Sequence, residues 1–203
     1  RCQTWPQEAE KKLAVYRIPA GQDAIDVRLA LSKKARDMIK KPKFNVAGRQ
    51  YRRDCSGFVL AVMAQQGGAS DVLLTSDFKG GVAAIFFAAV KRGLVHKRKT
   101  PAIGDLVFFD NTYDRNRDGR LNDPLTHIGI VERVDADGTV TFIHHVKRGI
   151  LRYKMNLFTP NLRRDSKTKK VLNHYIRVAP KSAAGSSRKL TGELFHAYAT
   201  IIR

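Results

Sequence analysis

The apolar periodicity of this chain changes near Pro101, and that change constrains the fold more than any other feature. Over residues 24–41 apolar side chains recur at close to helical spacing, which predicts a helix that ends before Pro42. Small and apolar residues at 55–66 predict a buried helix, and residues 81–92 predict another. We therefore expect the part of the chain before Pro101 to be mainly helical.

After Pro101 the pattern favours strands. Residues 105–109, 127–134 and 139–146 are rich in β-branched and aromatic side chains, and residues 135–138 are typical of a hairpin turn. These segments predict an antiparallel meander. We also expect strands at 150–153, 175–178 and 194–202 and a loop at 181–187. Helices followed by a sheet indicate an α+β fold.

The length of 203 residues and a hydrophobic content of 43% suit one hydrophobic core. We expect an N-terminal extension at residues 1–23 and a single domain at 24–203. The longest apolar run, residues 82–90, is nine residues, far short of the roughly 20 that cross a bilayer as a helix. No secretory leader pattern is visible, so the chain is expected to be either cytosolic or an already processed mature form.

The charge is strongly positive, with 38 Lys and Arg against 18 Asp and Glu, a formal net charge of +20. Such a balance favours a polyanionic partner, which can be nucleic acid, a wall polymer or an anionic membrane surface. No helix-turn-helix, zinc-finger or aromatic RNA-binding motif is present. A nucleic-acid partner is therefore supported by charge alone. A surface whose charge only keeps the protein soluble is the simpler alternative.

The chain has two cysteines, Cys2 and Cys55. We favour two free thiols over one bridge, because Cys2 lies near the end of the sequence whereas Cys55 lies in a well-defined motif. Cys2 could instead carry a lipid or pair with another chain, and the sequence leaves that open.

Cys55 is expected to open the helix at 55–66. A helix start places backbone N–H groups and a partial positive charge near the sulfur, which predicts a lowered thiol pKa. The small neighbours Ser56 and Gly57 leave the sulfur accessible and let backbone amides reach a developing oxyanion. An inert cysteine buried in the core is the alternative.

Four blocks stand in order along the chain: Asp-Cys-Ser-Gly-Phe-Val at 54–59, Gly-Asp-Leu-Val-Phe-Phe at 104–109, His-Ile-Gly-Ile-Val at 127–131 and Phe-Ile-His at 142–144. Over about residues 40–150 they resemble the NlpC-like cell-wall cysteine peptidases, which are related to papain and to the CHAP amidases. The resemblance implies a papain-like NlpC-type fold, with the catalytic cysteine at a helix start packed on an antiparallel sheet.

The resemblance implies that Cys55 attacks the scissile carbonyl, that His127 moves the proton, and that a third residue orients the imidazole. Both His144 and His145 are available for the third position. Strand alternation puts Phe142 and His144 on one face, so we favour His144. We expect ordinary surface or structural roles for His96, His174 and His196.

The approach to Cys55 lacks the tyrosine and Gly-Gly pair usual in the family. We expect Asp54, Ser56 and Arg53 to contact substrate. A guanidinium binds a carboxylate in bidentate fashion, so Arg49, Arg52 and Arg53 could pair with substrate carboxylates; solvated loop charges are an equal alternative.

Residues 110–125 form an insertion with the start of a calcium-loop pattern. Oxygen ligands would come from Asp114, Asn116, Asp118 and the carbonyl of Arg120, with Gly119 at the sharp turn. Leu125 stands where a bidentate glutamate is expected, so Asp123 or Asp110 would have to replace it. The alternative is a polar turn with internal caps. We predict a structural Ca²⁺ that the chemistry does not require.

The resemblance implies a hydrolase of peptidoglycan in the cell envelope, either periplasmic or secreted. The bond it implies is that between D-glutamate and the diamino acid. A CHAP-type N-acetylmuramoyl-L-alanine amidase is an alternative, as is a papain-like acyltransferase. A catalytically silent basic module that binds an anionic polymer is a further one. Peptidoglycan or its peptides, with an anionic wall or membrane surface, are the expected partners, and nucleic acid is not.

Overall fold

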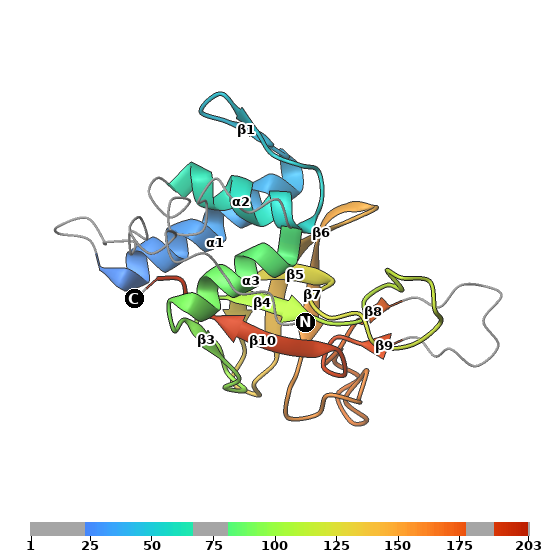
Figure 1. The fold of residues 1–203 in the computed structure, drawn as a ribbon. Helices are drawn as coiled ribbons and strands as arrows, with labels where there is room; N and C mark the ends of the chain where they lie inside the picture. The colour runs from blue at the N-terminus through green and yellow to red at the C-terminus, as the bar shows by residue number, and fades with distance from the viewer. Residues whose placement is uncertain (1–22, 67–80, 178–188, 203) are drawn as a thin grey trace.

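The computed structural model describes residues 23–66, 81–177 and 189–202, shown in Figure 1. Cys2 and the loop predicted at 181–187 lie outside the described residues. The helices and strands are α1 (Ala24–Lys40), β1 (Asn45–Val46), β2 (Arg49–Gln50), α2 (Cys55–Gln66), α3 (Gly81–Lys91), β3 (Val95–His96), β4 (Leu106–Phe109), β5 (His127–Val134), β6 (Val140–Val146), β7 (Gly149–Met155), β8 (Tyr175–Arg177), β9 (Lys189–Leu190) and β10 (Phe195–Ala199).

A six-stranded sheet with the order β3-β10-β4-β5-β6-β7 forms the centre of the fold, and all its neighbours are antiparallel. The predicted meander is confirmed, because β4 to β7 pair in sequence order. β10 returns from the end of the chain and lies between β3 and β4, which the sequence pattern did not indicate. The β1–β2 hairpin and strands β3 and β9, of two residues each, also went unpredicted.

Helices α1, α2 and α3 cover one face of this sheet (Figure 1). Asp23 caps α1 by accepting the N–H of Ile25 at 3.0 Å. The helix is confirmed, and its buried residues have helical spacing, but the apolar Ile25 and Leu29 that contribute to the sequence pattern are exposed. The core of this layer joins residues of α1 and α2 to alternate residues of the central strands, including Leu31, Phe58, Leu106, Phe108, Ile128 and Ile143.

The opposite face of the sheet is also covered. Val107, Val131 and Phe142 belong to a second buried cluster, against which Leu157 and Ile176 from the later part of the chain pack. Because every residue of β4 is buried, this strand shows no polar alternation. The sheet therefore sends alternate side chains into two different apolar layers.

Because side chains alternate between the two faces of a strand, the two histidines of β6 enter different layers. The ring of His144 contacts that of Phe142, with centroids 5.1 Å apart, on the face away from the helices. His145 points the other way and meets Phe44 edge-on at 5.6 Å. The two adjacent histidines thus have separate surroundings.

The Gly-Asp-Leu block has a structural explanation in Asp105, whose side chain is fully buried. Its carboxylate lies 3.2 Å from Nη1 of Arg28 and 3.3 Å from Nε2 of His96, and it accepts a hydrogen bond from Thr200 at 3.2 Å. The N–H of Ala102 donates to it at 2.9 Å. Asp105 therefore joins α1 to both β3 and the end of β10.

The mixed architecture of helices and antiparallel sheets agrees with the α+β prediction. None of the helices in the described ranges combines the length and hydropathy that crossing a membrane requires.

Candidate active site

Cys55 is the first residue of α2, as the sequence predicts. The preceding Asp54 caps the helix, because its Oδ1 accepts hydrogen bonds from the Gly57 N–H and the Ser56 hydroxyl, each at 2.8 Å. Its Oδ2 lies 2.7 Å from Nη2 of Arg52. Asp54 and Ser56 thus use their polar groups to fix the helix start, and their contact with substrate stays a prediction.

Gly57 allows the segment that precedes Cys55 to pass close to helix α2. A Cβ atom at this position would lie 1.9 Å from the carbonyl oxygen of Arg52, a contact with backbone that no side chain could relieve. The glycine of the Asp-Cys-Ser-Gly block is therefore required by the backbone path that presents Cys55.

The thiol of Cys55 does not have the lowered pKa that a helix start predicts. Burial and the neighbouring Asp54 carboxylate raise the pKa of Cys55 to about 11, from 9.0. Hydrogen bonds from the backbone N–H groups of Ile128, Ser56 and Cys55 oppose that rise without overcoming it. The prediction was wrong because it counted the helix dipole and omitted desolvation and the charge of the capping carboxylate.

His127 begins β5, opposite Phe109 of β4. The imidazole Nε2 of His127 lies 2.7 Å from Nδ1 of His144, and the rings meet edge-to-face with centroids 5.0 Å apart. The Ile128 N–H, next along the chain, bonds the Cys55 sulfur. Nδ1 is the remaining ring nitrogen of His127, on the side away from His144.

Gly129 makes room for this histidine pair. A Cβ at Gly129 would lie 2.8 Å from the Phe142 ring, 2.9 Å from the Ile143 carbonyl oxygen and 3.3 Å from the His144 Cβ. The glycine in the His-Ile-Gly-Ile block thus permits the close packing of β5 on β6 at the level of His144.

Both histidines of the pair are held neutral. Burial, followed by the nearby His145, lowers the pKa of His127 to about 4, from 6.5. Burial also lowers the pKa of His144 well below its ordinary value, with His127, His174 and His145 adding to the effect. At neutral pH the resting site therefore contains a neutral thiol and two neutral imidazoles.

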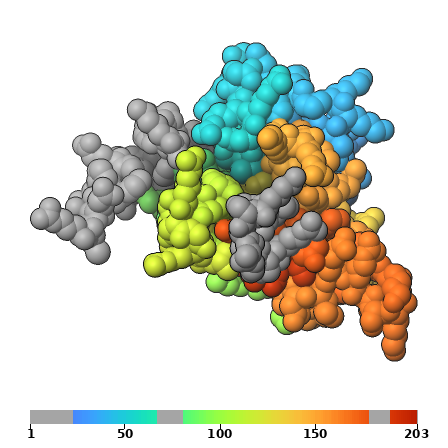
Figure 2. Space-filling model, turned by 90° about the vertical axis from the view of Figure 1, so that its right-hand side faces the viewer, coloured from blue at the N-terminus to red at the C-terminus, as the bar shows by residue number. Residues whose placement is uncertain are grey.

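Cys55 and His127 line the same pocket, of about 1090 Å³. Figure 2 looks onto the face where the cyan start of α2, the yellow-green segment 110–125 and the orange β6–β7 turn border this hollow. The cations Arg53, Arg115 and Lys147 also line it. The pocket is large enough for a peptide of a few residues, and its rim is basic.

His145 lines this pocket but has no hydrogen bond to His127 within the described ranges. Burial lowers the pKa of His145, while Asp54 opposes and Arg53 assists that shift. Of the two histidines considered for the third position, the structure brings His144 against His127 and leaves His145 at the pocket wall.

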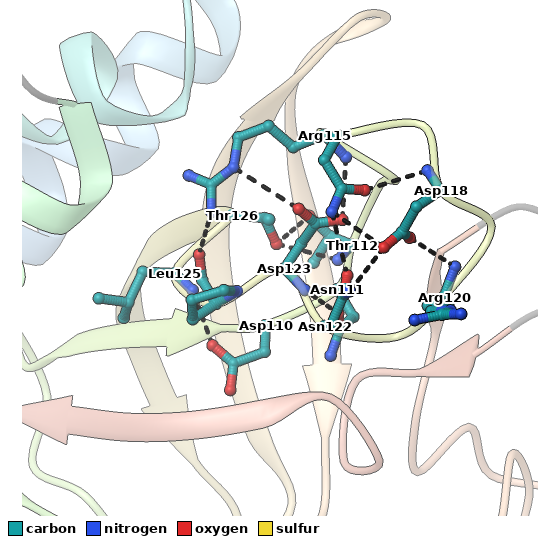
Figure 3. Close-up of polar contacts among 12 residues, drawn as sticks. Asp110, Asn111, Thr112, Arg115, Asp118, Arg120, Asn122, Asp123, Leu125 and Thr126 are labelled. Atoms are coloured by element: carbon teal, nitrogen blue, oxygen red, sulfur yellow. Dashed lines mark hydrogen bonds and ion pairs between the residues drawn. The ribbon is translucent and has the colours of Figure 1, made fainter.

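The segment 110–125 is anchored at its base, just before His127 (Figure 3). Asp110 Oδ1 accepts the Leu125 N–H at 2.7 Å, and Thr126 Oγ1 accepts the Thr112 N–H at 2.9 Å. Leu125 has a φ of 51°, a conformation that is unfavourable for a branched side chain. These bonds fix the backbone that leads into β5.

The predicted calcium ligands lie in this segment, where they bond one another. Asp118 Oδ1 accepts the Arg120 N–H at 2.8 Å, and Asn122 donates to Asp118 Oδ2 at 2.6 Å (Figure 3). Asn116 also donates to Asp118, and Asp114 Oδ2 accepts the Gly119 N–H at 2.8 Å. Asp123 is buried and lies 3.7 Å from Nε of Arg115. In the ranges described, no three His, Cys, Asp or Glu side chains gather as a group that could hold a metal ion. Calcium binding therefore stays a prediction that depends on amide and carbonyl oxygens.

The remaining histidines have the structural contacts that the sequence predicts. His96 lies at Asp105, and Nδ1 of His196 lies 2.8 Å from Oδ2 of Asp110. His174 stacks on Tyr153. No sequence pattern indicated Lys147 and Arg115 as pocket residues, because their place depends on how the β6–β7 turn and the 110–125 segment fold over the pocket.

A comparison with protein families matches residues 45–145 to the family described as CHAP domain. Residues 45–145 belong to this family. The match begins at β1, ends at His145, and includes Cys55, His127 and His144. No curated protein matches the chain, and no solved structure does.

The CHAP domain is papain-related, and its members are cysteine peptidases and amidases that hydrolyse cell walls. The predicted relationship to papain-like cell-wall enzymes is thereby confirmed. The CHAP domain supports a hydrolase that acts on peptidoglycan, as a cysteine peptidase or amidase.

Proposed function

We propose that the protein hydrolyses a peptide or amide bond of peptidoglycan through an acyl-enzyme on Cys55, with His127 as base and His144 as its orienting residue. The observation that carries the proposal is the 2.7 Å contact between His127 and His144, beside a pocket that Cys55 shares. The presence of Cys55, His127 and His144 together argues against a catalytically silent module.

Acylation starts from the neutral pair. The Cys55 sulfur attacks the scissile carbonyl while Nδ1 of His127 takes the thiol proton, so a C–S bond forms as negative charge moves to the carbonyl oxygen. As the sulfur bonds to carbon, the Cys55 and Ser56 N–H groups that bonded it at rest become available to bind that oxygen. The C–N bond then breaks, and His127 gives the proton to the departing amine.

Deacylation reverses the proton path. Water attacks the thioester as His127 removes its proton, the C–S bond breaks, and the thiolate recovers that proton. The products are a carboxylate and an amine, with the thiol restored. His127 is a cation only while each tetrahedral intermediate exists, and the neutral His144 at 2.7 Å accepts its Nε2–H during that time.

The bond we favour lies between D-glutamate and the diamino acid of the stem peptide. That region of peptidoglycan carries free carboxylates, and Arg53 and Lys147 on the pocket rim are suited to bind them. The CHAP match favours a second candidate, an N-acetylmuramoyl-L-alanine amidase, because the family contains amidases as well as peptidases.

A cell-envelope setting fits this chemistry. The net charge of +20 would concentrate the protein on an anionic wall or membrane surface by long-range attraction. That attraction weakens as salt is raised, since the Debye length falls to about 3 Å at 1 M.

We also propose that Ca²⁺ binds the 110–125 segment and steadies the backbone before His127. Asp114 Oδ1, which is buried without a hydrogen-bond partner in the described residues, is available as a ligand. Calcium should raise the melting temperature by a few degrees and increase turnover, and Asp114→Asn should abolish both responses. An unchanged melting temperature and rate on chelation would rule the ion out.

Purified muropeptides test the proposed reaction directly. Wild type should yield fragments whose masses identify the bond, and Cys55→Ala should yield none, whereas Cys2→Ala should match wild type. Cleavage between D-glutamate and the diamino acid supports the endopeptidase, and release of intact stem peptide supports the amidase. Absence of turnover by wild type would favour the silent binding module.

A further inference from the structure

Four aromatic rings form a continuous row that starts at His127 and runs into the layer away from the helices. His127 bonds His144, and the centroid of the His144 ring lies 4.3 Å from that of Tyr153 on β7. Tyr153 in turn stacks on His174 at 4.8 Å with an angle of 13° between the planes. Tyr153 and His174 lie beyond residue 145, outside the matched CHAP segment.

The protonation of His144 decides whether His127 can act as a base. A neutral imidazole has one N–H, and one of the two rings must donate in the 2.7 Å contact. If His144 donates from Nδ1, His127 keeps its proton on its own Nδ1 and cannot take one from a thiol. If His127 donates from Nε2, its Nδ1 is free, and the proton of His144 lies on Nε2.

When His127 donates, the proton of His144 lies on Nε2, and that N–H requires a hydrogen-bond acceptor. That nitrogen is buried and has no hydrogen-bond partner among the described residues. No carboxylate in the described ranges bonds either ring. Tyr153 gives the closest of the ring contacts to His144, at 4.3 Å against 5.0 Å for His127 and 5.1 Å for Phe142.

The face of an aromatic ring can act as the acceptor for this N–H. It carries negative quadrupole charge, accepts an N–H weakly and stabilises a nearby cation. We propose that Tyr153, steadied by His174, is a positioning residue that keeps the proton of His144 on Nε2 and favours the imidazolium state of the pair. The catalytic part of this proposal rests on the proposed function.

His174 is fixed for this purpose. Its Nδ1 accepts the backbone N–H of Lys154 at 2.9 Å, which places its own proton on Nε2 and sets the plane of the ring. Burial first, and then Lys154, lower its pKa, so it remains neutral and adds no positive charge behind Tyr153. The other titratable group that acts on His144 is His145, from the same strand.

Substitutions at residue 153 separate electrostatics from packing. Tyr153→Phe keeps the ring and should retain activity within about threefold. Tyr153→Leu removes it and should lower kcat about tenfold with little change in KM. Pentafluorophenylalanine at residue 153 keeps the ring shape and reverses the quadrupole, so it should behave like leucine even if Tyr153→Leu fails to fold.

Nitrogen-15 NMR of the histidine rings gives a readout that does not require turnover. Wild type and Tyr153→Phe should show His127 and His144 both protonated on Nε2, and the pentafluorophenylalanine protein should show His144 partly protonated on Nδ1. Unchanged ring protonation and rate in that protein would overturn the inference. If no form of the protein cleaves peptidoglycan but the NMR result is as expected, the positioning role of Tyr153 stands and the proposed function fails.

Discussion

Two histidine sites lie on the same sheet, and they differ in the partner of the histidine. His96 lies 3.3 Å from the fully buried carboxylate of Asp105, whereas His127 lies 2.7 Å from another imidazole, His144. In each site one ring nitrogen, Nδ1 of His96 or Nε2 of His144, is buried without a hydrogen-bond partner in the described residues. His96 is half-buried whereas His127 and His144 are buried, so the two sites differ in burial as well as in partner.

A carboxylate partner suits a structural role, because it fixes opposite charges and donors in one place. Asp105 gathers Arg28, His96 and Thr200 from three separate elements. An imidazole partner leaves the pair neutral at rest and able to hold a proton for part of a reaction. We infer that the first site stabilises the fold and that the second performs the chemistry.

The largest expected effect is the loss of activity when the His127–His144 site loses its base. His127→Ala should lower kcat/KM by about 10³-fold, since general acid–base catalysis contributes roughly 10²–10⁴-fold. His145→Ala, which removes a pocket histidine with no bond to His127, is the matched control and should lose less than about tenfold. Kinetics on soluble muropeptides measures both variants. Equal losses of kcat/KM would contradict the different roles of His127 and His145.

The next effect concerns stability. Asp105→Asn should destabilise the fold by about 3–5 kcal/mol, because it leaves Arg28 without its buried counter-charge. Asp37→Asn, which breaks an exposed pair with Lys33, is the control and should cost less than about 1 kcal/mol. Denaturant unfolding measures both variants. A loss below about 1 kcal/mol for Asp105→Asn would contradict a structural role.

Acid should weaken the fold through the second site. Burial lowers the pKa of His127 to about 4 in the folded protein, against the ordinary histidine value of 6.5. Between these pH values the unfolded chain binds a proton that the folded protein does not, so stability falls as pH falls from 6.5 to 4. The loss is about 3 kcal/mol for this group. His127→Gln should flatten that part of the curve, and an unaltered slope would argue against a buried neutral imidazole.

The last prediction concerns the reactivity of the thiol. Because the pKa of Cys55 is about 11, its alkylation by iodoacetamide should rise about tenfold per pH unit from pH 7 to 10. The rate should be followed in Cys2→Ala, so that only Cys55 is modified. A plateau at neutral pH would instead indicate a thiolate–imidazolium pair already formed at rest.

Much of this arrangement follows from local pattern. Helix α2 begins at Cys55 and β5 begins at His127, as periodicity and the ordered blocks predict. Strand alternation favoured His144 over His145, and the structure places His144 against His127. These features depend on neighbours in sequence, which a period of two or of about 3.6 residues describes.

Other features depend on contacts between distant residues. The insertion of β10 beside β4 joins segments almost 90 residues apart, as in the pair Ala197 and Phe108. The raised pKa of Cys55 depends on burial by elements that its own motif does not contain. The row from His144 through Tyr153 to His174 likewise cannot be predicted from the sequence pattern, because it joins two strands and the segment just before β8.

The acyl-enzyme itself gives the most direct test of Cys55 as the nucleophile. Wild-type protein mixed with muropeptide and quenched in acid within one turnover should gain the mass of the acyl fragment, and peptide mapping should place that gain on Cys55. His127→Ala should accumulate little or no adduct. Turnover with no adduct on Cys55, or cleavage by Cys55→Ala at the wild-type rate, would contradict the account.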